Sequence, residues 1–192
     1  MTRDQPKCIA LIGPRGCGKT TVGRILASLL GGECVDTDEW IAQRAGRSIA
    51  EVFAAEGEAC FRRLESEVIH EVVQSPPAVI SVGGGAVLHQ QNVDALRAAA
   101  ILVWLTAPAE VLWQRISTDP ATASLRPPLT DQPGVEEVRR LLAERSPLYQ
   151  RASDFQIETV DREPREIATE IVKRVRPPGV MDGRTNAQGR RC

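Results

Sequence analysis

The octapeptide at residues 13–20, GPRGCGKT, constrains this chain more than any other segment. It fits the pattern G-x-x-x-x-G-K-[ST], follows an apolar run at Cys8–Ile12, and precedes a segment with helical spacing at residues 22–30. A strand before the pattern and a helix after it distinguish a phosphate-binding loop from an ordinary glycine-rich turn. Glycines allow several backbone N–H groups to converge on one phosphate, and the helix directs its positive end to the same place. The sequence therefore predicts a nucleotide-binding site.

Two residues of this loop have defined chemical tasks. Lys19 is expected to reach the outer phosphates, and the Thr20 hydroxyl is placed to bind Mg²⁺. The chain has only three lysines among its 24 basic residues, so a lysine stands where a compact point charge is useful. The residues predicted to bind ATP at this loop are Gly13, Pro14, Arg15, Gly16, Cys17, Gly18, Lys19, Thr20 and Thr21.

Alternating apolar runs and amphipathic segments predict an α/β fold with a doubly wound, largely parallel sheet. The longer apolar runs lack alternation, which is typical of parallel strands covered on both faces. Residues 22–30, 61–73 and 135–149 and the segment Pro164–Val175 have the apolar spacing of helices. The expected strands are Cys8–Ile12, residues 33–35, 78–82 and 101–105, and Phe155–Glu158.

The rest of the chain organisation is read from composition. Residues 1–176 suit one domain. Residues 118–133 are polar and contain four prolines, which indicates a mobile flap, or lid. Residues 177–192 are rich in Gly, Pro and Arg without periodicity, and we expect a disordered tail.

Charge and cysteine content exclude several classes of protein. A formal net charge of −1 gives no overall field for nucleic acid or an anionic membrane, so neither is an expected partner. The N-terminal residues do not form a signal peptide, and no apolar run approaches the roughly 20 residues of a membrane helix. The five cysteines form no C-x-x-C pair, which favours reduced thiols in a cytoplasmic protein. No large apolar stripe stands out, and a monomer is expected.

Two acids follow the second expected strand, in the order Asp36, Thr37, Asp38. In a doubly wound sheet the crevice lies beyond the carboxyl ends of the strands, so these acids are expected to face the phosphate loop. One could hold Mg²⁺ through its water shell, and the other could accept a proton from an attacking hydroxyl. Capping of the next helix is the alternative, and it is compatible with catalysis.

Arginines and glycines farther along the chain suggest an anion-binding site. Arg62 and Glu65 lie three apart on one helical face, where a solvated ion pair is the simpler interpretation. Residues 83–85 are three glycines after a strand, which permit a ligand to approach the backbone or merely form a flexible turn. Arg126 lies in the proline-rich flap and Arg145 ends the next helix. Each is a surface charge when taken singly, but together they favour an anion trap.

These motifs occur in the order and approximate spacing of the shikimate kinase family, which the chain resembles over about residues 7–175. The resemblance rests on the phosphate loop, Asp36-Thr37-Asp38, Gly57-Glu58 with Phe61-Arg62, the triple glycine, Arg126-Pro127, and Arg145 with Tyr149. It implies a nucleoside-monophosphate-kinase type of P-loop fold with five parallel strands and a mobile lid. It also implies transfer of the ATP γ-phosphoryl group to the 3-hydroxyl of shikimate, on the route to the aromatic amino acids.

The resemblance assigns roles to individual residues. Lys19, Asp38 and Arg126 are implied as catalytic, with Asp38 helping to deprotonate the attacked hydroxyl and Arg126 contacting the phosphates. Thr20 and Asp36 are implied for Mg²⁺, and Arg162 and Pro164 for adenine, with Arg115 as a weaker candidate for its other face. The implied shikimate-binding residues are Asp38, Arg62 and Arg145 with Gly83, Gly84 and Gly85, the apolar Phe53 and Phe61, and Glu65, which orients the arginines.

Some features depart from this family pattern or leave other functions open. Arg15 places a cation where a small or apolar residue is expected, and the segment between Arg115 and Arg126 is a few residues longer than usual. Gluconate-type and nucleoside monophosphate kinases share a phosphate loop and a lid. A non-catalytic P-loop module that senses a ligand is an alternative of another class, but it would be expected to lack Asp38, Arg62 or Arg126.

Overall fold

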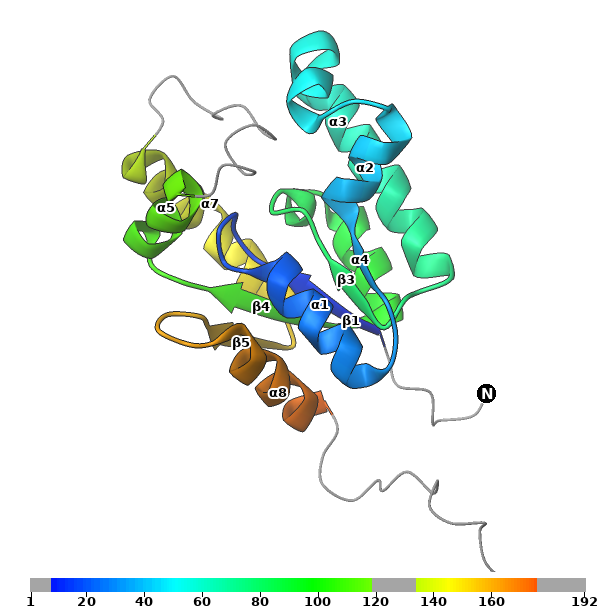
Figure 1. Ribbon diagram of the computed structural model, residues 1–192. Helices are drawn as coiled ribbons and strands as arrows, with labels where there is room; N and C mark the ends of the chain where they lie inside the picture. The colour runs from blue at the N-terminus through cyan, green and yellow to red at the C-terminus, as the bar shows by residue number, and fades with distance from the viewer. Residues whose placement is uncertain (1–7, 119–133, 176–192) are drawn as a thin grey trace, which may run out of the picture.

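The computed structural model describes residues 8–118 and 134–175, and it confirms the predicted α/β fold (Figure 1). The predicted helices are present, and the second of them begins earlier than predicted, at Ile49. The elements in chain order are β1 (Cys8–Ile12), α1 (Lys19–Leu30), β2 (Cys34–Asp36), α2 (Thr37–Ala45), α3 (Ile49–Gln74), β3 (Val79–Ser81), η1 (Ala86–Leu88), α4 (Gln90–Ala99), β4 (Ala100–Thr106), α5 (Ala109–Thr118), α7 (Val135–Ala152), β5 (Phe155–Glu158) and α8 (Pro164–Val175).

The five strands form one parallel sheet in the order β2-β3-β1-β4-β5. Every residue of β1 is buried, and its side chains alternate between two cores. One core packs the sheet against α2, α3, α4 and α7, and the other packs it against α1, α5 and α8. Burial on both faces explains why the strand sequence is apolar without alternation.

Strand order places the crevice at the end of β1. The chain leaves β1 toward α1, and its two neighbours in the sheet, β3 and β4, belong to opposite halves of the winding. Loops at the carboxyl ends of such strands diverge and leave a ligand-binding crevice between them. The loops that follow β1 and β3 carry the phosphate loop and the triple glycine. The two acids lie where β2 runs directly into α2, because Asp36 ends the strand and Asp38 is in the first turn of the helix.

Helix α3 carries the one kink that matters for the site. Its first turn is a capping box in which Ser48 and Glu51 exchange hydrogen bonds. At Gly57 the backbone adopts φ 76° and ψ 177°, which interrupts the helix before it restarts toward Phe61 and Arg62. The kink therefore separates an outer helical segment from the segment that carries the predicted substrate arginine.

Several predictions lie outside the described residues. The flap with Arg126 and the tail at residues 177–192 both do, so the division into one domain, lid and tail stays a prediction. Within the described segments, Cys8, Cys17, Cys34 and Cys60 are free thiols. Burial raises the pKa of Cys8 to about 12, which makes its thiol inert at neutral pH. No helix among these segments is long and apolar enough to cross a membrane.

Candidate active site

The phosphate loop wraps closely around the end of β1. Gly13 has φ 140°, and a Cβ at this position would overlap the carbonyl oxygen of Leu105, so only glycine is accommodated. Lys19 begins α1, and its Nζ donates to the carbonyl oxygens of Gly13 and Pro14, each at 2.9 Å. The ammonium group thus lies over the loop, at the positive end of the helix, where anions are stabilised.

A second cluster joins the phosphate loop to β2 and β3. The hydroxyl of Thr20 donates to Asp36 Oδ2 at 2.6 Å, and the hydroxyl of Ser81 donates to the same oxygen at 2.9 Å. The other carboxylate oxygen, Oδ1, accepts from the backbone N–H of Asp38 at 2.9 Å and caps α2. Asp36 is therefore a helix cap and part of an oxygen cluster at once, which is the coexistence that the sequence left open.

This cluster suits Mg²⁺ by the chemistry of its donors. Thr20, Asp36 and Ser81 offer two hydroxyls and a carboxylate, and Mg²⁺ prefers oxygen ligands. Mg²⁺ usually keeps several waters and takes few protein ligands, so a compact cluster beside the phosphates is sufficient.

Two carboxylates flank the first residue of the triple glycine. A Cβ on Gly83 would lie 2.8 Å from Asp38 Oδ1 and 2.9 Å from Glu65 Oε1. The backbone N–H of Gly83 donates to the buried hydroxyl of Thr37 at 2.9 Å, which ties this turn to the start of α2. Asp38 is half-buried, whereas Glu65 is fully buried. Glycine at this position lets the turn pass between the two acids.

Glu65 holds Arg62 against the last residue of the triple glycine. Arg62 NH1 lies 2.8 Å from Glu65 Oε2, and the Arg62 side chain is 12% exposed. Burial by itself lowers the pKa of the guanidinium, but Glu65 and Glu58 outweigh it and raise the pKa overall. Because the carboxylate of Glu65 is buried, the pair is not the solvated surface ion pair that the sequence allowed. Arg62 is therefore a cation held in place at the edge of the glycine turn.

We expect Gly85→Ala to weaken binding of an anionic acceptor. A Cβ at Gly85 would fall 2.7 Å from Cζ of Arg62, so the guanidinium must move. Overpacking of this kind costs about 1–3 kcal/mol, or about a 5- to 150-fold rise in Kd if it falls on binding. Gly134→Ala is the control, because a Cβ there meets no atom of residues 8–118 or 134–175 within 4 Å. Calorimetric titration of both variants with shikimate checks this, and equal affinities would contradict it.

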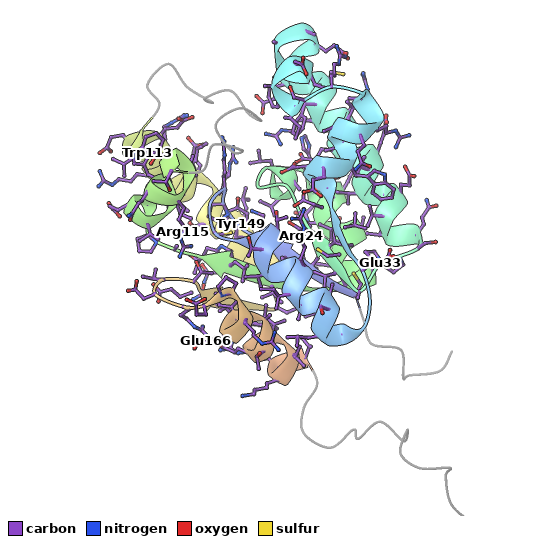
Figure 2. The ribbon with its side chains drawn as sticks, viewed as in Figure 1. Arg24, Glu33, Trp113, Arg115, Tyr149 and Glu166 are labelled. Carbon is purple, nitrogen blue, oxygen red and sulfur yellow. The ribbon has the colours of Figure 1, made fainter. Side chains whose placement is uncertain are left out.

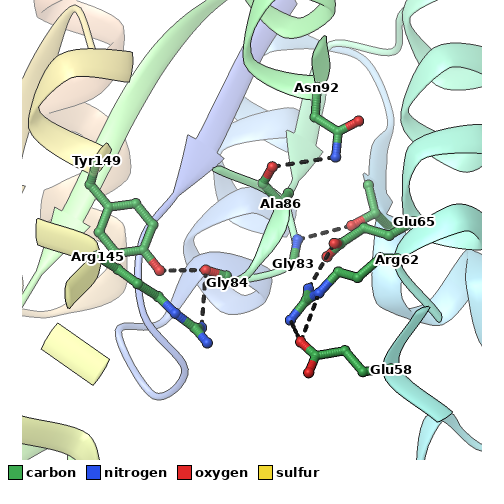
Figure 3. Close-up of polar contacts among 10 residues, drawn as sticks. Glu58, Arg62, Glu65, Gly83, Gly84, Ala86, Asn92, Arg145 and Tyr149 are labelled. Atoms are coloured by element: carbon green, nitrogen blue, oxygen red, sulfur yellow. Dashed lines mark hydrogen bonds and ion pairs between the residues drawn. The ribbon is translucent and has the colours of Figure 1, made fainter. Parts of the chain in front are cut away.

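Helix α7 reaches the same turn from the other side (Figure 3). The buried hydroxyl of Tyr149 donates to the carbonyl oxygen of Gly84 at 2.5 Å, and Arg145 NH1 donates to it at 3.5 Å. Burial raises the pKa of Tyr149, so its hydroxyl stays protonated and keeps donating. Trp104 stacks on Tyr149 with ring centroids 5.8 Å apart. The Nε of Arg145 is buried without a hydrogen-bond partner in the described part of the chain.

A cleft of about 640 Å³ collects most of these groups. It is lined by the phosphate loop, the two acids after β2, Ser81 at the end of β3, and Gly84. Arg15 and Thr21 also line it, so the unexpected cation of the loop faces the cleft. Arg62 and Arg145 stand at the glycine turn, beyond this lining. Phe61 is buried in the core and packs on the half-buried Phe53, with centroids 4.7 Å apart.

The predicted adenine residues are placed differently from one another. Arg115 lines the cleft and donates to the carbonyl oxygens of Gly16 and Thr159, at 3.4 and 2.8 Å (Figure 2). Arg162 instead pairs with Glu170 at 2.6 Å and lies outside the cleft lining, and Pro164 begins α8. Their contacts with adenine stay predictions.

Sequence comparison matches the geometry of this site. A family model described as shikimate kinase matches residues 15–176. The chain belongs to the shikimate kinase family. It is 41% identical over 169 residues to a shikimate kinase of Rhodopirellula baltica, covering 88% of this chain and 90% of the relative. It is 44% identical over 170 residues to shikimate kinase 2 of Dickeya chrysanthemi, covering 88% and 96%. As a member of the shikimate kinase family, the protein is a phosphotransferase that uses ATP.

Solved structures of the shikimate kinase family share the fold. A shikimate kinase from Acinetobacter baumannii in complex with shikimate superimposes with a TM-score of 0.81 and 36% identity, covering 88% of this chain and 92% of that chain. The enzyme from Aquifex aeolicus gives a TM-score of 0.72 and 33% identity, covering 85% and 93%. The resemblance read from the motifs, and the fold implied by it, are thereby confirmed.

Sequence reasoning missed two side chains of the site. Ser81 holds the carboxylate of Asp36, and Thr37 holds the backbone of Gly83. The available signal was position, because Ser81 is a polar residue near the end of an apolar run, two residues before the triple glycine, and Thr37 stands between the two acids. Both are hydroxyls buried at the carboxyl ends of strands, where site residues gather.

Proposed function

We propose that the protein transfers the γ-phosphoryl group of ATP to the 3-hydroxyl of shikimate, giving shikimate 3-phosphate and ADP. One observation supports this most. Asp38 lies beside Gly83 and lines the same cleft as the phosphate loop, and the next two glycines of the turn contact Arg145 and Arg62. The loop proposed to hold the phosphate donor, the proposed proton acceptor and the two arginines proposed to bind a carboxylate therefore all lie near the triple glycine.

Catalysis in this arrangement is mainly positioning and charge neutralisation. The backbone N–H groups of the loop and the Lys19 ammonium hold the outer phosphates in line with the acceptor. Mg²⁺, when bound, neutralises phosphate charge, and Thr20 with Asp36 and Ser81 are the residues that would hold it. From the flap, Arg126 is proposed to meet the charge that develops during transfer, and Arg162 and Pro164 to pack on adenine.

Asp38 is proposed to accept the proton of the 3-hydroxyl. Its backbone N–H is fixed by Asp36, and its side chain stands against the Gly83 backbone, so the carboxylate has a defined direction. As the new oxygen–phosphorus bond forms and the bond to the ADP oxygen breaks, the hydroxyl proton passes to the carboxylate.

Arg62 and Arg145 are proposed to bind the carboxylate of shikimate. They approach the triple glycine from α3 and α7, so they face one another across the turn (Figure 3). Guanidinium groups pair with carboxylates through two parallel hydrogen bonds, which fixes the orientation of the ring as well as its position. The half-buried Phe53 is proposed to supply the apolar surface near Arg62 that a ring requires, with the buried Phe61 packed beneath it.

A shikimate-dependent ADP-release assay tests this function. We expect turnover with ATP, Mg²⁺ and shikimate, and turnover at least about 10²-fold lower with gluconate or a nucleoside monophosphate, because neither presents a carboxylated ring to two arginines. Omission of Mg²⁺ should abolish the reaction. Gluconate or nucleotide turnover above that with shikimate would contradict the assignment, and absence of any turnover would favour a binding module.

We further propose that the protein is a monomer in the cytoplasm. Its proposed partners are small molecules, and neither nucleic acid nor a membrane is among them.

A further inference from the structure

The carboxylate of Glu58 pairs with one edge of the Arg62 guanidinium, which is the group proposed to bind the carboxylate of the substrate. Arg62 Nε and NH2 both donate to Glu58 Oε1, at 3.2 and 3.0 Å. Glu58 follows the kink at Gly57 and stands one helical turn before Arg62, as an i,i+4 pair. Nε and NH2 form one of the edges through which a guanidinium binds a carboxylate bidentately.

The neighbours of Arg62 differ in their freedom to move. Glu65, which accepts from NH1, has a side chain that is 1% exposed, and the backbone of Gly85 packs directly on the guanidinium. The side chain of Glu58 is 63% exposed. Figure 3 shows Glu58 and Glu65 contacting the guanidinium from opposite sides. Of these neighbours, Glu58 alone can leave Arg62 at small cost, because it can return to water.

The charges of the site point the same way. Arg62 and Arg145 carry two positive charges, and Glu58 and Glu65 carry two negative charges, so the four groups are neutral together. A substrate carboxylate entering a neutral group gains less than one entering a group with a net positive charge. Asp38, beside Gly83, adds a further negative charge to the site. Movement of Glu58 into solvent therefore removes one of three negative charges from beside the incoming anion, and it frees the Nε–NH2 edge for pairing.

We propose that Glu58 is an internal stand-in for the substrate carboxylate, which displaces it from the Nε–NH2 edge of Arg62 on binding. This inference rests on the proposed function, since it concerns the carboxylate of shikimate. Glu58 touches no reacting atom; it acts through Arg62 and sets the affinity of the acceptor site. In the substrate-free protein it keeps the guanidinium paired and held in place beside the glycine turn.

Glu58→Gln tests the proposal by removing the competing charge. An exposed ion pair of this kind contributes little, so we expect the Kd and KM for shikimate to fall about two- to fivefold. The kcat, the KM for ATP and the melting temperature should stay the same, which separates loss of a competitor from a structural change. Glu58→Ala should act in the same direction. Glu67→Gln, which removes an equal charge from an exposed position on the same helix, should leave all values unchanged.

The methyl ester of shikimate provides the sharper control. It lacks the anionic carboxylate, so Glu58→Gln should not improve its binding in calorimetric titration. An equal gain for acid and ester, an unchanged Kd for shikimate, or a raised Kd would overturn the proposal; a raised Kd would mean that Glu58 steadies Arg62 for the substrate. If the unmodified protein turns over shikimate and only these variant results fail, the inference alone is lost. If it neither binds nor turns over shikimate, the proposed function is lost with it.

Discussion

Replacing Asp38 with asparagine is expected to lower kcat for shikimate-dependent ADP release by about 10²–10⁴-fold, the usual contribution of a positioned proton acceptor. Asparagine keeps the shape of the side chain, so its place beside Gly83 and the start of α2 is preserved. It cannot accept the proton of the attacked hydroxyl. The KM for ATP should stay nearly unchanged, because the phosphate loop is held by other contacts.

Steady-state kinetics with both substrates varied measures this effect. Asp94→Asn is the matched control, since it removes one carboxylate charge from an exposed position on α4. Its kcat should equal that of the unmodified protein. Full activity of the Asp38→Asn variant would exclude the role of Asp38 as base, and a large rise in the KM for ATP would show that Asp38 supports the nucleotide instead.

Arg62→Ala is expected to damage binding and stability together. Loss of a desolvated charge pair to the substrate weakens binding by about 2–5 kcal/mol. The change also removes the cation that pairs with the fully buried Glu65, and breaking a buried ion pair by removing one member costs about 3–5 kcal/mol of stability. Urea denaturation and calorimetric titration with shikimate measure the two effects separately.

A second substitution distinguishes the two causes. Glu65→Gln in the Arg62→Ala background removes the buried charge that has lost Arg62, so it should restore much of the lost stability and none of the lost affinity. Arg63→Ala is the control, because Arg63 is the exposed neighbour of Arg62 on the same helix. An Arg62→Ala variant as stable as the unmodified protein would show that Glu65 has another source of stabilisation.

The centre of the fold is the part that the sequence predicts best. The expected strands at Cys8–Ile12 and Phe155–Glu158 have the observed bounds, and each of the other three differs from the observed strand by one residue at both ends. Runs that are buried on both faces must be apolar at every position, so they stand out from any other segment. Ends of strands carry polar site residues, which is why the apolar pattern misplaces them; Asp36 belongs to β2.

Burial within the site is the part that the sequence does not encode locally. The spacing of Arg62 and Glu65 predicts that they are neighbours, but a solvated pair and a buried pair have the same spacing. Only the packing of α3 against the sheet and the glycine turn makes Glu65 inaccessible. Ser81 illustrates the same limit. Its role depends on the fold bringing Thr20, at the start of α1, and Asp36, at the end of β2, next to it.

Gly84 has a consequence for the geometry of transfer. Its carbonyl oxygen accepts a hydrogen bond from Tyr149. A Cβ on Gly84 would lie 3.3 Å from the carbonyl oxygen of Gly13 in the phosphate loop. A single peptide unit is thus held between Tyr149 of α7 and the phosphate loop. Any side chain at this position would press on the carbonyl oxygen of Gly13, so the glycine turn and the phosphate loop can approach one another this closely only with Gly84 between them.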